Sequence, residues 1–303
     1  MILKVTDPEK VRQLFDGWEE TMIWSCLQGI MGSLYAEYPE SRNSEGLGFS
    51  KNKALRETEN SDTPLSAKAM LGDFVFLAGK PSRNLLIYYP EAETSQCENR
   101  LKECREAAGF QILVPRSRDW ELLIENTYRH IYGCSVERIT RYAIKKEPDI
   151  WNGEGRKKLE RMAAALPEGY ELHLIDEKYY DQCRQKEWSR DLVSQFPDYE
   201  MYKRWGLGVV ACHEKKIVSG ASSYSRYLEG IEIEIDTKEE YRRRGLGRAC
   251  AARLILECLD RGLYPSWDAH TEISAELAEK LGYHRGEAYT AYLLTEEKGL
   301  QAE

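Results

Sequence analysis

The sequence predicts an α/β protein built from two domains. Its 303 residues are enough for two ordinary domains, each with its own buried core. Apolar residues make up 42% of the chain and charged residues 31%, as in typical soluble globular proteins. Strand-like and helix-like runs follow one another along both halves. Pro, Asn and Gly cluster in segment 147–155, so we place the boundary near residue 150, between an N-terminal α/β partner domain (1–150) and a C-terminal domain (151–303).

Charge and composition argue against several classes of partner. The net charge of −8 disfavours nucleic acid and anionic membranes as main partners. The longest apolar run, 249–259, is interrupted by Arg253 and Glu257, and the first residues lack the pattern of a signal peptide. The eight cysteines form no C-x-x-C pair and the five histidines show no metal-ligand spacing. We therefore expect reduced thiols, a cytoplasmic location and no metal.

The N-terminal half shows secondary structure but no chemical motif. Its patterns predict a helix over 8–20, an apolar segment over 22–36, strands over 73–78, 85–89, 110–114 and 139–144, and a helix over 119–132. The stretch from Pro39 to Pro64 is polar, and we interpret it as a long surface loop or a partly disordered insertion. No glycine loop or catalytic cluster is present in this half.

The C-terminal half has a more regular pattern, after an opening helix over 157–166. The predicted order is β, α, α, β, β, β, α, β, α, β, over residues 170–175, 177–188, 197–205, 208–213, 216–224, 231–237, 246–261, 266–269, 274–281 and 289–294. Gly262 and Gly282 follow the last two helices, as C-terminal caps do. Cys250 and Cys258 lie on one helix and are expected to fill the core.

The segment from Ile231 to Arg248 carries the clearest chemical signal. An alternating strand leads through a short turn into a glycine-bearing loop and then a helix. The N–H groups of such a loop, together with the helix N-terminus, form a cradle for an anion. Gly245 and Gly247 would let the backbone approach a phosphate closely, and the surrounding arginines attract a polyanion.

The spacing of the glycines selects among the known phosphate loops. A Walker A loop is absent, and a dinucleotide fingerprint would need a third glycine where Cys250 stands. The pattern Arg242-x-x-Gly245-x-Gly247 fits instead the pyrophosphate loop of the GNAT acetyltransferases. The run Glu279–Tyr283 looks like the closing helix and Gly-Phe/Tyr end of that family. Residues 166–296 therefore resemble a GNAT acyl-CoA N-acyltransferase domain.

A narrower resemblance covers most of the chain. Segments 24–29, 71–74, 142–146 and 264–269 look like a two-part GNAT group that includes proteins similar to zwittermicin A resistance acetyltransferases. In that group the N-terminal half is a partner domain that can be a degenerate copy of the same fold. No sequence repeat shows this here.

The resemblance implies acetyl-CoA as cosubstrate and names the residues that would bind it. Strand N–H groups near the thioester carbonyl and the pyrophosphate loop would contribute Ile235, Asp236, Thr237, Arg242, Arg243, Arg244, Gly245, Leu246, Gly247 and Arg248. Thr271 stands where many relatives carry an Asn that bonds the pantetheine arm. It can serve there or cap a helix together with Ser274, and capping is the favoured role.

Two glutamates are candidates for the general base. Glu232 and Glu234 alternate with isoleucines, so both face the side of the strand opposite the helix. An attacking amine must lose a proton, and GNAT enzymes often keep a Glu on this strand for that purpose. The alternative is a solvated strand face without a catalytic role.

The general acid departs from the pattern of the family. The usual Tyr position is occupied by Ala278, and the other candidates are Tyr283, Tyr289 and Tyr292, none of which we select. His270 is a further candidate base, although a lone His near a strand end is usually structural. The segment Trp188–Phe196 either forms a packed turn or, as in GNAT folds, walls the acceptor pocket.

The predicted function is acetyl transfer from acetyl-CoA to a primary amine of a small molecule, without an acyl-enzyme intermediate. The alternative is a catalytically silent module that binds or senses acyl-CoA. Ala278 favours the alternative, whereas Glu232 and Glu234 favour the enzyme. A homodimer is a candidate assembly.

Overall fold

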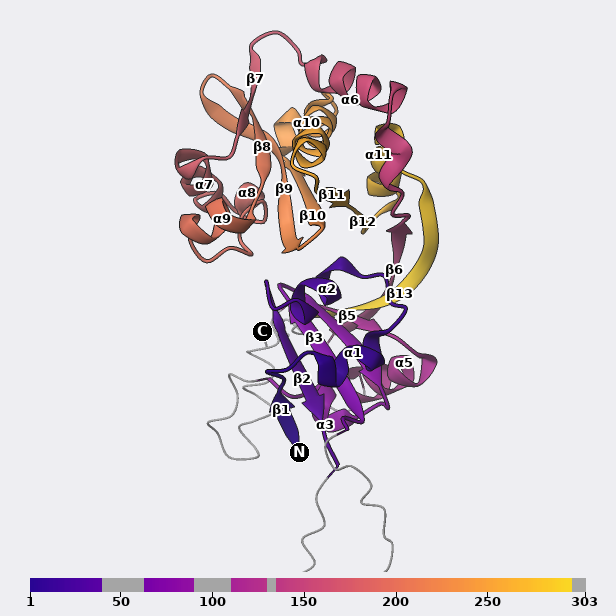
Figure 1. Ribbon diagram of the computed structural model, residues 1–303. Coiled ribbons are helices and arrows are strands. Elements are labelled where there is room, and N and C mark those ends of the chain that lie inside the picture. Colours follow the sequence, from indigo (N-terminus) through magenta and orange to yellow (C-terminus); the bar gives the residue numbers. More distant parts are fainter. Residues whose placement is uncertain (40–62, 90–109, 130–134, 296–303) are drawn as a thin grey trace, which may run out of the picture. The chain divides into compact units, whose positions relative to one another are not determined.

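A computed structural model describes residues 1–39, 63–89, 110–129 and 135–295. The chain forms two compact units (Figure 1). Unit 1 comprises Met1–Glu19, Gly32–Arg138 and Ala291–Glu303, and unit 2 comprises Glu20–Met31 and Ile139–Thr290. These units differ from domains of residues 1–150 and 151–303, because a short N-terminal segment belongs to unit 2 and the C-terminal segment belongs to unit 1. Such crossings depend on tertiary contacts, which leave no mark in local composition.

The core of unit 2 is a five-stranded sheet in the order β11-β10-β9-β8-β7. Its strands are β7 (Tyr170–Leu174), β8 (Gly208–His213), β9 (Lys216–Tyr227), β10 (Gly230–Thr237) and β11 (Tyr264–Ser266). Neighbours are antiparallel except for β10 and β11, which are parallel. Glu214 and Lys215 both have positive φ in the β8–β9 turn, which suits a tight hairpin. The predicted strands over 170–175, 208–213, 216–224 and 231–237 are therefore confirmed, whereas the predicted strand over 266–269 divides between β11 and β12 (Asp268–Ala269), which belong to different sheets.

Helices cover both faces of this sheet. Alternate residues of β8 divide between two cores: Val209 and Ala211 face one, Val210 and Cys212 the other. The first core holds α10 (Leu246–Asp260) and α6 (Glu154–Ala164), with Cys250 and Cys258 fully buried as predicted. The second core lies beneath α7 (Glu177–Arg184), α8 (Glu187–Arg190) and α9 (Tyr199–Trp205). Figure 1 shows α10 lying along the sheet.

Further elements complete unit 2. These are α2 (Thr21–Leu27), the 3-10 turn η3 (Pro148–Trp151), η4 (Glu239–Tyr241), β12 (Asp268–Ala269) and α11 (Glu272–Leu281). Two long strands, β6 (Ser135–Ile144) and β13 (Arg285–Thr295), carry the chain from one unit into the other. β12 pairs with the part of β6 that belongs to unit 2.

Unit 1 repeats the strand pairing of unit 2. Its sheet runs β1 (Ile2–Lys4), β2 (Ser33–Glu37), β3 (Ser66–Leu71), β4 (Phe74–Gly79) and β5 (Gln111–Pro115), followed by the end of β13. The pairs β1–β2, β2–β3 and β3–β4 are antiparallel, and the pair β4–β5 is parallel. Unit 2 has the same sequence of pairings, with the parallel pair β10–β11 at the end. The α/β class is confirmed, and the shared pairing supports a degenerate copy of one fold in unit 1.

Several predicted elements of unit 1 differ in the structure. The predicted strand over 85–89 is wrong: the chain forms α3 (Arg83–Leu86), because the Ser82 side chain accepts the Leu85 N–H and starts a helix. The apolar segment over 22–36 divides into α2 and β2, after α1 (Glu9–Phe15). The helix predicted over 119–132 consists of α5 (Arg118–Ile124) and a short π-helix, η2 (Glu125–Arg129), and its predicted end lies outside the described residues. Most of the predicted loop 39–64 also lies outside them. No helix in the described part of the chain has the length and apolarity needed to cross a membrane.

Candidate active site

Strand β10 extends beyond its parallel neighbour. The pairing with β11 runs from Gly230↔Tyr264 to Glu232↔Ser266 and stops there. From Ile233 to Thr237, β10 remains paired with β9, after a register shift between Glu232 and Ile233. From Ile233 onward, the edge of β10 that faced β11 is therefore not paired with β11, and the acidic side chains predicted from the sequence lie on or next to this part of the strand.

Glu232 is a buried carboxylate with one open oxygen. It is 6% exposed, and its Oε2 accepts a hydrogen bond from the hydroxyl of Thr21, the first residue of α2. Its Oε1 has no hydrogen-bond partner among the described residues. Burial, opposed by the Thr21 hydrogen bond, raises the pKa of Glu232 to about 7. Glu232 can therefore gain or lose a proton near neutral pH.

Glu234 and Asp236 continue the same row. Burial, with the nearby Asp236 carboxylate, raises the pKa of Glu234 to about 8. Burial and Asp191 raise the pKa of Asp236 to about 6. The Glu234 Oε1 accepts the Ile235 N–H at 3.1 Å. This amide was predicted to face the thioester carbonyl, so Glu234 would have to release it before the amide could bind a substrate oxygen.

A second group of polar side chains surrounds Glu232. Arg141 donates from Nε to the Asp268 carboxylate at 2.6 Å, and both side chains are only 7% exposed. Tyr289 donates to the same Asp268 oxygen at 2.9 Å, while the other oxygen, Oδ1, has no partner among the described residues. Burial, with the charges of Asp268 and Glu232, raises the pKa of Glu20 well above its ordinary value. We call Glu20, Glu232 and Asp268 the carboxylate cluster.

The predicted pyrophosphate loop joins β10 to α10. Gly245 is the N-cap of α10 and has φ +79°, a conformation that glycine adopts without strain. A glycine cap has no side chain to accept the first N–H groups of the helix, and none caps them here. Arg242, Arg243 and Arg244 are exposed around this end. Uncapped amides and nearby guanidinium groups fit a polyanion such as a pyrophosphate.

Gly247 has a packing role that the sequence did not reveal. A Cβ at this position would lie 3.2 Å from Thr237 Oγ1 and 3.4 Å from Ile235 Cγ2. The glycine therefore lets the first turn of α10 approach β10 closely. Leu246 is buried beside it and Arg248 is exposed.

The remaining candidates divide between structural and polar roles. Thr271 is the N-cap of α11, and its hydroxyl accepts the Ser274 N–H at 3.2 Å, so the predicted capping is confirmed. The Ser274 hydroxyl in turn accepts the Trp267 indole N–H at 3.1 Å. His270 is exposed and its Nδ1 lies 3.2 Å from Arg141 Nη1.

The three tyrosines considered as general acids lie in different surroundings. Tyr283 is buried and donates to the Pro265 carbonyl at 2.6 Å, whereas Tyr292 belongs to unit 1. Tyr289 alone of the three bonds to the carboxylate cluster. Burial and Asp268 raise its pKa well above the ordinary value, so its hydroxyl stays protonated.

Sequence patterns alone did not predict the polar residues near Glu232. Thr21 precedes one of the segments that carried the narrower resemblance, and Arg141 precedes another, while Asp268 lies inside a third. The signal was therefore the occurrence of these segments together, which the fold explains by bringing α2, β6 and β12 to one site. The segment Trp188–Phe196 is partly core, because Leu192, Val193 and Phe196 are buried. No group of three or more His, Cys, Asp or Glu side chains in the described ranges is arranged to hold a metal.

Comparison with known proteins identifies the family of the chain. The family model "GNAT acetyltransferase" matches residues 57–292. A GCN5-related N-acetyltransferase-like protein from Streptococcus suis 89/1591, known from a crystal structure, has 43% sequence identity to this chain and a TM-score of 0.75. The match covers 95% of this chain and 98% of that one. The uncharacterized N-acetyltransferase YdfB of Bacillus subtilis (strain 168) is 34% identical over 140 residues, 42% of this chain and 49% of the relative. The match thus spans about half of that curated relative. The chain belongs to the GNAT acetyltransferase family, a family of acyltransferases.

Proposed function

We propose that the protein transfers an acetyl group from acetyl-CoA to a primary amine of a small molecule. The observation that carries this proposal is the row of carboxylates on β10, of which Glu232 is buried and Glu234 half-buried. Glu232 and Glu234 have pKa values of about 7 and about 8, on a strand whose edge is free beyond β11 and which leads into an uncapped helix N-terminus. The carboxylates would supply the base, the free strand edge would bind an extended cosubstrate, and the helix N-terminus would bind its pyrophosphate.

The carboxylates supply the proton acceptor. A free amine has a pKa near 10, so at neutral pH it arrives mainly as an ammonium ion. Transfer of its proton to Glu232 or Glu234 gives the nucleophile, and the amine nitrogen then attacks the thioester carbonyl carbon. The carbon–sulfur bond breaks, the thiolate leaves with the bonding pair, and the second proton of the attacking nitrogen passes to water, which gives the neutral amide. A base with a pKa near the working pH is well suited to this step.

Two further groups would assist the transfer. The N–H groups of Ile235 to Thr237 would hold the carbonyl oxygen once Glu234 releases the Ile235 amide. A thiolate with a pKa near 8.5 departs with little help, whereas the raised pKa of Tyr289 makes its hydroxyl, which donates to Asp268, a weak acid. The loop residues Arg242–Arg248 would hold the pyrophosphate. Direct attack requires no acyl-enzyme intermediate.

The proposal also includes the cellular compartment, the partners and the oligomeric state of the enzyme. Among the described residues, the cysteines at 183, 212, 250 and 258 are buried without a disulfide, which supports a reducing compartment such as the cytoplasm. The net charge of −8 supports a small-molecule partner over nucleic acid or anionic membrane. The homodimer stays a prediction.

The proposal is tested by binding and turnover of the full chain. Acetyl-CoA should raise the melting temperature much more than NAD or ATP, because it alone fits the loop and strand together. CoA release should then depend on an amine when a broad amine library is screened. Binding of acetyl-CoA without amine-dependent release from any acceptor would favour the silent sensing module. A larger thermal shift with NAD or ATP would overturn the cosubstrate.

A further inference from the structure

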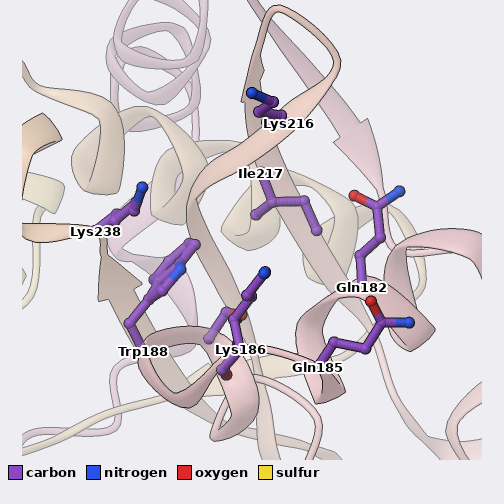
Figure 2. A pocket seen from close by; sticks show the side chains of 8 residues that line it. Gln182, Gln185, Lys186, Trp188, Lys216, Ile217 and Lys238 are labelled. Atoms are coloured by element: carbon purple, nitrogen blue, oxygen red, sulfur yellow. Dashed lines mark hydrogen bonds between the residues drawn. The ribbon is translucent and has the colours of Figure 1, made fainter.

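A separate cavity lies on the α7–α8 side of unit 2. Its volume is about 480 Å³. The lining residues come from α7, α8 and the two residues between them, the start of β9 and the residue after β10. They are Gln182, Gln185, Lys186, Trp188, Ser189, Lys216, Ile217 and Lys238. Figure 2 shows Lys186 and Trp188 between Lys238 on one side and the two glutamine amides on the other, with Lys216 above them. We call this site the lysine pocket.

The lysine pocket carries a concentrated positive charge. Three of its lining residues are lysines and none is acidic. Lys186 and Lys216 are exposed, and neither forms an ion pair with a residue that the structure describes. Lys238 pairs with Glu240 at 2.5 Å, outside the lining set. Such ammonium groups, left without acidic partners inside a cavity, are suited to bind an anion.

The other walls indicate the kind of anion. Trp188 is half-buried and offers an aromatic surface, and the two glutamines offer amide donors. A phosphate accepts several hydrogen bonds at once, and a planar group attached to it can stack on an indole ring. We propose that the lysine pocket binds a phosphate group carried by a ligand with a planar part.

The place of the pocket allows two sources for this phosphate. Lys238 directly follows Thr237, at the end of β10 that leads into the pyrophosphate loop. The 3′-phosphate and adenine of CoA are one source, and this version depends on the proposed function. A separate phosphorylated ligand is the other source, and it does not depend on acetyl transfer.

Matched lysine variants of the full chain test the proposal. The site variant carries Lys186→Gln and Lys216→Gln. The control variant carries Lys158→Gln and Lys203→Gln, which remove the same charge from exposed positions on α6 and α9. Equal melting temperatures establish that both are folded. Calorimetric titration then measures the Kd for CoA, 3′-dephospho-CoA, AMP and inorganic phosphate.

The pattern of affinities identifies the source. A loss of about tenfold or more for CoA, with 3′-dephospho-CoA unchanged, in the site variant alone places the CoA phosphate in the pocket. A similar loss for AMP and phosphate, with both CoA forms unchanged, supports a separate ligand. Unchanged affinities for all four probes, or an equal loss in the control variant, would overturn the pocket. Failure of the proposed function is distinguishable, because acetyl transfer is measured separately as amine-dependent CoA release by wild-type protein, whereas the pocket is judged only by the difference in Kd between the site and control variants.

Discussion

The hydroxyl of Thr21 donates a hydrogen bond to the carboxylate of Glu232, although the two residues are 211 positions apart in the sequence. Thr21 begins α2, which belongs to unit 2 although the segments on both sides of it belong to unit 1. The site on β10 is therefore completed by a segment from the first tenth of the chain. The charge and pKa of Glu232 depend on that segment.

Replacing Thr21 should shift the pH dependence of the reaction. The hydrogen bond favours the charged form of Glu232 and lowers its pKa, so Thr21→Val should raise that pKa further. If Glu232 is the base, the acidic limb of the kcat profile moves to higher pH by roughly one unit, and kcat at pH 7 falls several-fold. Thr21→Ser keeps the hydroxyl and should leave the limb in place. A folded Val variant with an unmoved limb would show that Glu232 does not titrate in the reaction.

Alanine variants of the two glycines at the ends of α10 distinguish the effect of backbone strain from the effect on cosubstrate binding. Gly245 and Gly262 have similar positive φ, +79° and +68°, and neither meets a close neighbour at the Cβ position. Alanine at either position should cost about 1–2 kcal/mol of unfolding free energy, measured by chemical denaturation. Only Gly245→Ala should also weaken acetyl-CoA binding by calorimetry, since it distorts the loop. Equal affinities in the two variants would remove the loop from the binding site.

The variant Gly247→Val would affect both the packing of α10 and the binding of the cosubstrate, although the glycine motif alone predicts an effect on binding only. The new side chain would press on Thr237 and Ile235, so it should destabilise the contact of α10 with β10 by about 1–3 kcal/mol. A loss of cosubstrate binding in that variant would be explained by either effect.

The raised pKa of Glu234 should make the protein less stable as pH rises. Its folded pKa is about 8, above the ordinary 4.5, so the folded state binds more protons than the unfolded state between these values. The unfolding free energy contributed by this group therefore falls from about pH 4.5 to about pH 8. Glu234→Gln removes the charge and should be more stable than wild type at pH 8.5, on the order of 2 kcal/mol, with the difference vanishing near pH 4.5. Denaturation curves at both pH values measure this, and a gain that is the same at both would contradict the raised pKa.

Most helices and strands of unit 2 could be predicted from the sequence because each is determined by residues close together in the chain. The alternation of β10, the glycine after α11 and the turn at Glu214-Lys215 are each set by a few neighbouring residues. The same holds for the loop before α10, where a glycine motif, a strand and a helix follow directly on one another. In unit 1 the segment over 85–89 misled because its apolar side chains suit a buried strand and a buried helix turn equally, and the Ser82 cap decided between them.

The surroundings of Glu232 could not be predicted in the same way. Thr21, Arg141 and Asp268 lie on three elements that only the fold brings together, and each is an unremarkable residue in its own segment. The role of Gly247 was also hidden, because the contact with Thr237 exists only once α10 lies on β10. Sequence therefore identified the loop and the strand, whereas the tertiary structure identified what tunes the carboxylates.

The base assignment on β10 is tested most directly by kcat as a function of pH for Glu232→Gln, Glu234→Gln and the double variant, with an amine acceptor and saturating acetyl-CoA. Each change is nearly isosteric, so acetyl-CoA affinity should remain close to that of wild type. We expect one single variant to lose about 10²- to 10⁴-fold in kcat at pH 7 and to recover part of it at high pH, where more amine is already deprotonated. Wild-type kcat in both single variants and in the double variant would contradict the account, because β10 would then carry no base.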